Sequence, residues 1–306
     1  LWGQFVGDAA GLGTHWIYDL SDMARRFPGG VYGFETPGSG HYHEGKKSGD
    51  QTHYGDAALL VLESVAACGE FREADFGMRL EAFFSLPGCI TYRDNSTRDT
   101  LAHLEEEPDN YQNGAIDDEP ATVTRLAPVV VAYTNREPAA LADAIRRLTL
   151  VTQNHPTALV CAAASAELLR HLLTGMPFRE AFELGRKSST DSYDASDYFE
   201  LAYTRREEDV ISATDYFGKS CPLSESFPAA LHAAWRHHDN FAEAVLATIH
   251  AGGDNAGRAA MVGSWLGACL GVESIPPSCI ERLSERERIQ SAIDQLLTRC
   301  IDQKPG

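Results

Sequence analysis

Apolar residues recur at helical spacing along most of the chain, and this periodicity predicts an all-α protein. One clear apolar stripe consists of Leu141, Ile145 and Leu148. Alternating strand patterns are nearly absent, and the short valine run at 129–131 lies inside a predicted helix. The pattern predicts helices over residues 57–67, 138–151, 157–173, 177–187, 226–251 (a pair of helices that meet near 239–240) and 284–301.

Three polar segments interrupt the helical pattern and are predicted to be loops. Residues 28–49 are rich in glycine and histidine, residues 105–120 are acidic, and residues 188–197 are rich in serine and aspartate. None of them is long or polar enough to separate two domains, and no repeat of fixed period is present. The sequence therefore predicts one compact multi-helix domain over residues 1–306.

Composition narrows the range of partners. The net charge of −18 opposes binding to a phosphate backbone or an anionic membrane, although a local cationic pocket for a small phosphate ligand remains compatible with it. No apolar run approaches the ~20 residues needed to span a bilayer, and no signal peptide is recognisable. The seven cysteines are scattered and never form a CxxC pair, so we expect reduced thiols in a cytoplasmic protein.

A glycine-rich turn near residue 252 is the first candidate site. Gly252 and Gly253 permit a sharp turn, and Asp254 stands where a helix of small residues begins. The N-terminus of a helix offers free N–H groups to a phosphate or carboxylate group, and Asn255 and Arg258 lie in its first turn. Asp254 either caps this helix or holds a hard cation through its oxygen atoms.

A second candidate site precedes the predicted helix 57–67. Six polar or flexible residues converge there, namely Gly49, Asp50, Gln51, Thr52, His53 and Asp56. Their oxygen-rich side chains suit Mg²⁺ or Ca²⁺ better than zinc. Simple capping by Thr52 or Asp56 explains only one of these groups, so the pattern favours a functional site.

Two further clusters carry polar groups. Asp8 lies among small residues, where an acid is costly unless it is hydrogen-bonded, and we expect it to organise the structure. His15, next to Trp16, is a candidate base, ligand or stacking partner. Asn154 and His155 occupy a turn between two predicted helices, which suits either a pocket lining or a simple connection.

Taken together, these motifs resemble those of the ADP-ribosylglycohydrolase family. The resemblance rests on Gly7-Asp8-x-x-Gly11, an acidic helix start at 54–56, the Asn154-His155 turn and Gly252-Gly253-Asp254. Residues 14–19 are similar to the J1-crystallin and selenoprotein J branch of that family. The resemblance implies a compact all-α domain. For active members it also implies two Mg²⁺ or Mn²⁺ ions that hold the ribose of ADP-ribose during hydrolysis.

The chain departs from the family pattern at each metal motif. The family's Thr-Asp-Asp-Thr falls on residues 49–52 or 54–57, and one carboxylate is missing in either register. Ala256 stands where the late motif has a second Asp, and His15 stands where active members carry a Glu. Two divalent cations about 4 Å apart need several carboxylates to offset their repulsion. The resemblance therefore implies one Mg²⁺ ion or none, with Asp50, Asp56 and Asp254 as its ligands.

These observations lead to two main hypotheses. The first is a hydrolase of the N- or O-glycosidic bond of an ADP-ribosyl group or related nucleotide sugar, acting on an ADP-ribose-type small molecule or an ADP-ribosylated protein. The alternative is a catalytically silent relative that binds a nucleotide or serves as a crystallin-like structural protein; a pocket adapted to a different small substrate is a third possibility. His15 and Asp56 are the predicted catalytic residues. The predicted ligand-binding residues are Asp8, Gly49, Gln51, Thr52, His53, Asn154, His155, Gly252, Gly253, Asn255 and Arg258.

Overall fold

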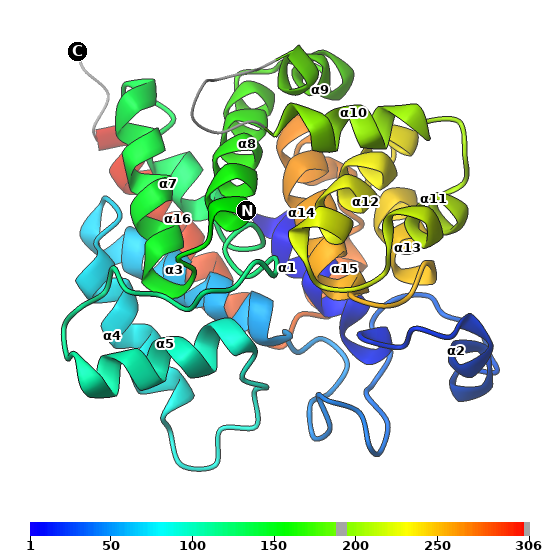
Figure 1. The fold of residues 1–306 in the computed structure, drawn as a ribbon, viewed down its shortest axis with the longest axis horizontal. Coiled ribbons are helices and arrows are strands. Elements are labelled where there is room, and N and C mark those ends of the chain that lie inside the picture. The colour runs from blue at the N-terminus through cyan, green and yellow to red at the C-terminus, as the bar shows by residue number, and fades with distance from the viewer. Residues whose placement is uncertain (188–194, 303–306) are drawn as a thin grey trace.

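The computed structural model describes residues 1–187 and 195–302, and these ranges contain helices but no β-strand (Figure 1). The all-α prediction is confirmed. Helices from all parts of the chain share one continuous set of buried apolar side chains. The α-helices are α1 (Trp2–Gly11), α2 (Leu20–Arg26), α3 (His53–Cys68), α4 (Glu73–Phe84), α5 (Asn95–Glu106), α6 (Ala127–Ala132), α7 (Pro138–Thr152), α8 (Pro156–Leu173), α9 (Phe178–Lys187), α10 (Ser196–Thr204), α11 (Val210–Phe217), α12 (Leu223–Arg236), α13 (Phe241–His250), α14 (Asn255–Leu270), α15 (Pro277–Glu281) and α16 (Arg286–Asp302); short 3-10 turns cover Leu12–Thr14 and Val272–Ser274.

Each helix predicted from the periodicity is present, with shifted boundaries. The helix predicted over 57–67 is α3, which already begins at His53 because the Thr52 side chain accepts the Tyr54 N–H. The predicted pair over 226–251 is α12 and α13, and the Asn240 side chain caps α13 by accepting the Glu243 N–H.

The predicted loops are only partly loops. Residues 28–49 form turns and irregular backbone, as expected, whereas α5 extends through Glu106 into the acidic segment. Of the segment 188–197, residues 188–194 lie outside the described residues, and Ser196 and Asp197 belong to α10.

Helices α1 and α14 pack with their backbones in contact. A Cβ atom added to Gly3 would lie 1.9 Å from the carbonyl oxygen of Gly263, and one added to Gly7 would lie 2.0 Å from that of Ala259. Only glycine permits this approach. The pairing order is antiparallel, because Gly11 at the end of α1 meets Ala256 at the start of α14. The C-terminal end of the first helix is thus fixed beside the N-terminus of α14.

The remaining helices surround this pair. Helices α13, α12 and α8 pack against α14, whereas α3 packs against α16, α4 and α6 (Figure 1). The starts of α3 and α14 approach each other where the Tyr54 hydroxyl reaches Asp254. Loops 12–19 and 27–52 connect these elements.

Within the described ranges, no helix has the combination of length and apolarity needed to cross a bilayer. All seven cysteines are free. Cys161 is buried and the other six are half-buried, so most of them lie at the edge of the core.

Candidate functional site

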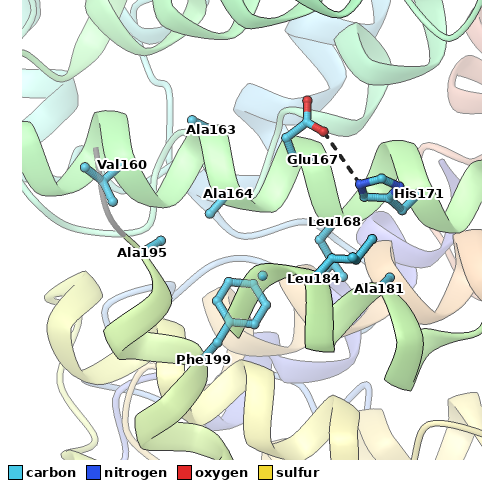
Figure 2. A pocket seen from close by; sticks show the side chains of 11 residues that line it. Val160, Ala163, Ala164, Glu167, Leu168, His171, Ala181, Leu184, Ala195 and Phe199 are labelled. Atoms are coloured by element: carbon cyan, nitrogen blue, oxygen red, sulfur yellow. Dashed lines mark ion pairs between the residues drawn. The ribbon is translucent and has the colours of Figure 1, made fainter. Parts of the chain in front are cut away.

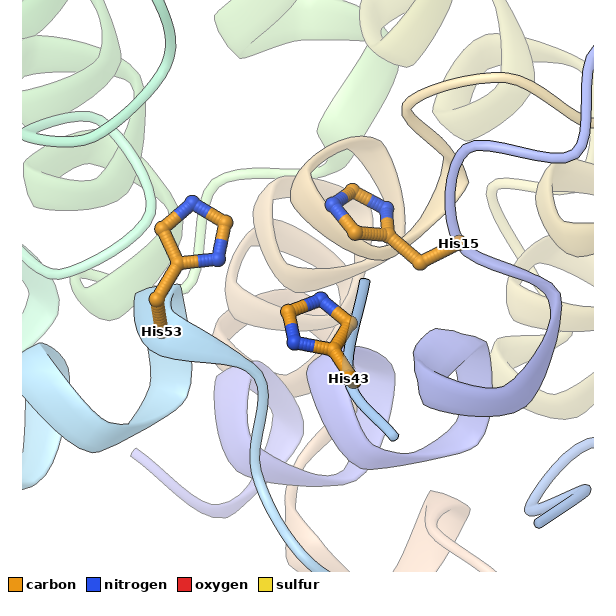
Figure 3. A group of neighbouring side chains, drawn as sticks. All are labelled: His15, His43 and His53. Carbon is orange, nitrogen blue, oxygen red and sulfur yellow. The ribbon is translucent and has the colours of Figure 1, made fainter. Parts of the chain in front are cut away.

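Three buried histidines meet where the starts of α3 and α14 approach each other (Figure 3). His15 follows the 3-10 turn after α1, His43 belongs to the loop before α3, and His53 is the first residue of α3. One ring nitrogen from each lies within 4.8 Å of the other two. We refer to these three residues as the histidine cluster. His15 and His43 are 0% exposed and His53 is 2% exposed, so these rings have little contact with water.

The glycine turn before α14 holds the segment that carries His15. Gly252 and Gly253 adopt φ values of 72° and 64°, which favour glycine. The Trp16 N–H donates to the Gly253 carbonyl at 2.7 Å, and the Gly253 N–H donates to the Ile17 carbonyl at 2.8 Å. Asn255 reinforces the junction, because its Nδ2 donates to Thr14 Oγ1 at 2.7 Å. The predicted ligand-binding residues Gly252, Gly253 and Asn255 therefore position the loop around His15.

Asp254 joins α14 to the histidine cluster. Its Oδ1 accepts the Gly257 N–H at 3.3 Å and lies 3.5 Å from His15 Nδ1, while its Oδ2 accepts the Tyr54 hydroxyl at 3.2 Å. The Ala256 N–H also donates to His15 Nδ1 at 3.4 Å. Asp254 is thus a helix cap and at the same time a partner of His15.

A second carboxylate stands behind His53. Asp94 Oδ2 lies 3.5 Å from His53 Nε2, and Asp94 Oδ1 caps α5 by accepting the Thr97 N–H at 2.8 Å. Sequence reasoning missed Asp94, because a single capping acid has no spacing that distinguishes it from other caps. It also missed His43, although the histidine-rich composition of residues 28–49 was a visible signal.

Burial sets the charge of the site. It lowers the pKa of His53 to about 4 and holds the pKa values of His15 and His43 well below their usual range, with smaller effects of the neighbouring histidines on His15 and His43. All three rings are therefore neutral at pH 7. Burial also raises the pKa of Asp254 to about 6 and that of half-buried Glu119 to about 8, and nearby carboxylates add to the effect on Glu119.

Aromatic rings link the histidine cluster to the surface. The Trp16 ring centroid lies 4.1 Å from that of His15, 5.6 Å from His43 and 5.4 Å from His53. The rings of Tyr42 and Tyr92 contact Trp16 edge-on at 5.0 and 4.9 Å. Tyr42 is 62% exposed, so the stack reaches solvent. Trp16 itself has a φ of 62°, which is unusual for a residue other than glycine.

Asp56 lies in a different environment. Its Oδ2 accepts Lys46 Nζ at 2.6 Å and Thr91 Oγ1 at 2.7 Å. These residues line a cavity of about 380 Å³ together with Asp50, whose Oδ2 accepts the Lys47 N–H at 2.7 Å. We refer to Lys46, Asp56 and Thr91 as the lysine site.

The predicted carboxylate ligands therefore do not fit Mg²⁺. Asp56 is already neutralised by an ammonium group, and Asp254 is occupied by a helix N-terminus and a tyrosine hydroxyl. Across the part of the chain that the structure describes, Asp50, Asp56 and Asp254 do not form one group of ligand atoms, whereas the histidine cluster does. The hard-cation site of oxygen ligands stays a prediction from the sequence, and the group of ligand atoms that the described residues bring together consists of nitrogens.

Asp8 and its neighbours fix the start of α3. The Asp8 carboxylate accepts the Thr52 N–H at 2.6 Å and the Thr52 hydroxyl at 2.5 Å, and burial raises the pKa of Asp8 to about 7. Gln51 donates from Nε2 to the Phe5 carbonyl at 3.3 Å. Gly49 has a φ of 93°, and a Cβ atom there would lie 1.9 Å from the Arg282 carbonyl oxygen. All of these contacts are internal to the protein.

Arg258 is fully buried beneath the glycine turn. Its guanidinium group donates to the Gly252 carbonyl and, at 3.3 Å, to the Lys219 carbonyl. The positive charge of Arg258, a predicted ligand-binding residue, is thus directed at main-chain oxygens. Burial lowers the pKa of Arg258, and Asp254 opposes this effect.

In the turn between α7 and α8, Gln153 reaches the site, whereas the predicted residues Asn154 and His155 do not. Asn154 is exposed and His155 caps α8, with Nδ1 accepting the Thr157 N–H at 3.3 Å. Buried Gln153 donates to Asp117 Oδ1 at 2.8 Å and to the Glu119 carbonyl at 2.7 Å. It thereby fixes the loop that carries Glu119.

A separate hollow of about 520 Å³ lies between α8, α9 and α10 (Figure 2). Its lining is mostly apolar, and its titratable residues are Glu167 and His171, 3.9 Å apart. No predicted site residue lines it.

Comparisons with known proteins agree with this architecture. Crystallin J1A of Tripedalia cystophora is 27% identical over 313 residues, which cover 96% of this chain and 94% of that protein. ADP-ribosylarginine hydrolase Tri1 of Pseudomonas putida (strain GB-1) is 25% identical over 261 residues, which cover 83% of this chain and 67% of that protein. A solved structure described as an ADP-ribosylglycohydrolase-related protein complex shares the fold, with a TM-score of 0.74, 24% identity and coverage of 97% of this chain and 95% of that one.

The sequence matches the ADP-ribosylglycohydrolase family over residues 1–306. The chain therefore belongs to the ADP-ribosylglycohydrolase family, and the family resemblance seen in the sequence motifs is confirmed.

Proposed function

We propose that this member of the ADP-ribosylglycohydrolase family hydrolyses the N- or O-glycosidic bond of an ADP-ribosyl group or a related nucleotide sugar. The relative that carries the name ADP-ribosylarginine hydrolase supports an ADP-ribosylated protein as substrate. The observation that carries the proposal is the buried contact between His15 and Asp254, at 3.5 Å, where α1 and α14 meet. A buried histidine oriented by a carboxylate is a typical arrangement for activating a nucleophile.

The site residues suit the two proton transfers of hydrolysis. A water molecule activated within the histidine cluster would attack the anomeric carbon, while the bond to the leaving nitrogen or oxygen breaks. Glu119, whose pKa is raised to about 8 by burial and by neighbouring carboxylates, is protonated at pH 7 and would donate a proton to the leaving group. The exposed Tyr42 ring offers a stacking surface for a nucleotide base.

The remaining predicted residues have positioning roles in this proposal. Asp8 and Thr52 hold the start of α3, and the glycine turn before α14 holds the loop that carries His15. Asp56, predicted to be catalytic, has a structural role in this proposal as the partner of Lys46.

Calorimetric titration of ADP-ribose, followed by product analysis on an ADP-ribosylated peptide, tests the proposal. We expect binding and release of ADP-ribose by the parent protein, and loss of turnover in Asp254→Asn. Asp143→Asn is the matched control, since Asp143 forms ion pairs on the exposed face of α7 and is remote in sequence from the site. Absence of both binding and product would contradict the proposal.

A catalytically silent, crystallin-like role is the second candidate. The observation that favours it is the ion pair between Asp56 and Lys46, which occupies a carboxylate of the family's first metal motif. The broad match to crystallin J1A points the same way. Tight ADP-ribose binding without any product would support this second candidate.

A further inference from the structure

We propose that His15, His43 and His53 bind one divalent transition-metal ion of the Zn²⁺ class. Three neutral imidazole ligands with a further position for water are typical of catalytic zinc sites. This site differs in chemistry from the carboxylate Mg²⁺ site that the family resemblance implies. It uses His43, which no sequence motif of the family singled out.

The positions of the nitrogen atoms carry the proposal. Figure 3 shows that each of the three rings turns a nitrogen toward the space between them. Atoms that lie within 4.8 Å of one another share a point about 2.8 Å or less from each, compared with about 2.0–2.1 Å for a Zn–N bond. Small rotations of the buried side chains therefore bring all three into bonding distance.

The hydrogen bonding of the rings supports the same conclusion. His15 Nε2 and both nitrogens of His43 and of His53 have no hydrogen-bond partner although they are buried. Burying such atoms without a partner is costly, and native proteins rarely leave them so. One bound ion would satisfy a nitrogen of each ring at once.

Two carboxylates stand behind these ligands. Asp254 lies 3.5 Å from His15 Nδ1, and Asp94 lies 3.5 Å from His53 Nε2. In metal sites an acid on the outer nitrogen fixes the tautomer of the ring, so that the inner nitrogen keeps its lone pair for the metal. Here that inner nitrogen would be Nδ1 of His53; Nδ1 of His15 accepts the Ala256 N–H at 3.4 Å and is held in place by that bond. The negative charge of the two acids also favours a dication between them.

Metal binding is measured without substrate, so a failed hydrolysis assay has no bearing on it. Chelator-treated full-length protein is titrated with Zn²⁺ in competition with a chromophoric chelator, and with Co²⁺ followed by visible absorption and proton NMR. We expect one ion per chain, Co²⁺ ligand-field bands, and three exchangeable imidazole N–H signals shifted by the paramagnetic ion. Failure to bind either ion, or fewer than three such signals, would overturn the proposal without any variant.

Variants then identify the ligands. We expect His43→Ala to weaken Zn²⁺ binding more than 100-fold, and Asp94→Asn to weaken it about 10–100-fold. His171→Gln is the control, because it removes a histidine of the separate hollow on α8 and should leave the affinity unchanged. If His43→Ala fails to fold, His43→Cys decides: a sulfur-to-cobalt charge-transfer band supports the proposal, and its absence overturns it.

Discussion

The first turn of α3 carries two polar sites of opposite character. His53 and Tyr54 face the histidine cluster and Asp254, whereas Asp56 faces Lys46 and Thr91. Tyr54 and Asp56 are two positions apart, which is about 200° around an α-helix, so these two residues of one motif enter different environments. In the lysine site the carboxylate has a cation and a hydroxyl as partners. In the histidine cluster several ring nitrogens have no partner. The first arrangement is that of a structural ion pair, and the second is that of a site prepared for a ligand.

The lysine site provides the largest expected effect. Lys46→Met leaves Asp56 without its cation in a buried setting, and breaking such a pair costs about 3–5 kcal/mol of the free energy of unfolding. Urea denaturation at pH 7 measures this loss. The double variant Lys46→Met/Asp56→Leu should recover most of it, because no unpaired charge remains. A loss below about 1 kcal/mol in the single variant would show that the ion pair is not structural.

The histidine cluster should respond in activity instead. Asp254→Asn keeps a residue that caps helices well, so the free energy of unfolding should change by less than about 1 kcal/mol. It removes the charge beside His15, and we expect turnover of an ADP-ribosylated peptide to fall about 100-fold. A variant that unfolds more readily but keeps its turnover would reverse the roles assigned to the two sites.

The acids around the histidine cluster predict a pH dependence. The pKa of Glu119 is raised from its ordinary 4.5 to about 8, so the folded state holds a proton that the unfolded chain has released. This contribution to stability is complete below about pH 4.5 and is lost as the pH rises through 8. Glu119→Gln should therefore gain stability relative to the parent between these pH values, as measured by urea denaturation of chelator-treated protein. Parallel pH profiles of the two proteins would contradict the prediction.

The smallest effect comes from a matched pair of hydroxyl deletions. Tyr54→Phe removes the bond to Asp254, and Thr91→Val removes the bond to Asp56. Each should lower the free energy of unfolding by about 1–2 kcal/mol. Calorimetry with ADP-ribose distinguishes them, because only Tyr54→Phe should weaken binding, by several-fold. Equal effects of both variants on binding would place the ligand near both sites.

Much of the fold was predictable because helical periodicity is a local property. The glycine turn and the capping role of Asp254 were predictable for the same reason, since two glycines before an acid and a helix of small residues leave few alternatives. It was not predictable that the residues from Asp50 to Asp56 would divide between two separate sites. This division depends on the helix beginning at His53 rather than at residue 57, which places Asp56 inside the first turn and directs it toward Lys46.

It was also impossible to predict from the sequence which residues form the histidine cluster. His43 and Glu119 lie in loops whose positions are set by contacts far along the chain, such as the bonds from Gln153 to Asp117 and to the Glu119 carbonyl. Composition marked both loops as unusual, but composition does not indicate which side chain of a loop is buried or what it faces.

The backbone contact between α1 and α14 has a consequence for synthesis of the chain. Gly3 and Gly7 pack against residues that are translated roughly 250 positions later. At about 5–20 residues per second, the ribosome delivers α14 roughly ten seconds to a minute after α1. During that interval α1, whose residues are almost all buried in the finished protein, lacks its main packing partner. Helix α1 is thus fully protected only after α14 has been made, and a nascent chain that stops short of α14 leaves part of its apolar surface exposed.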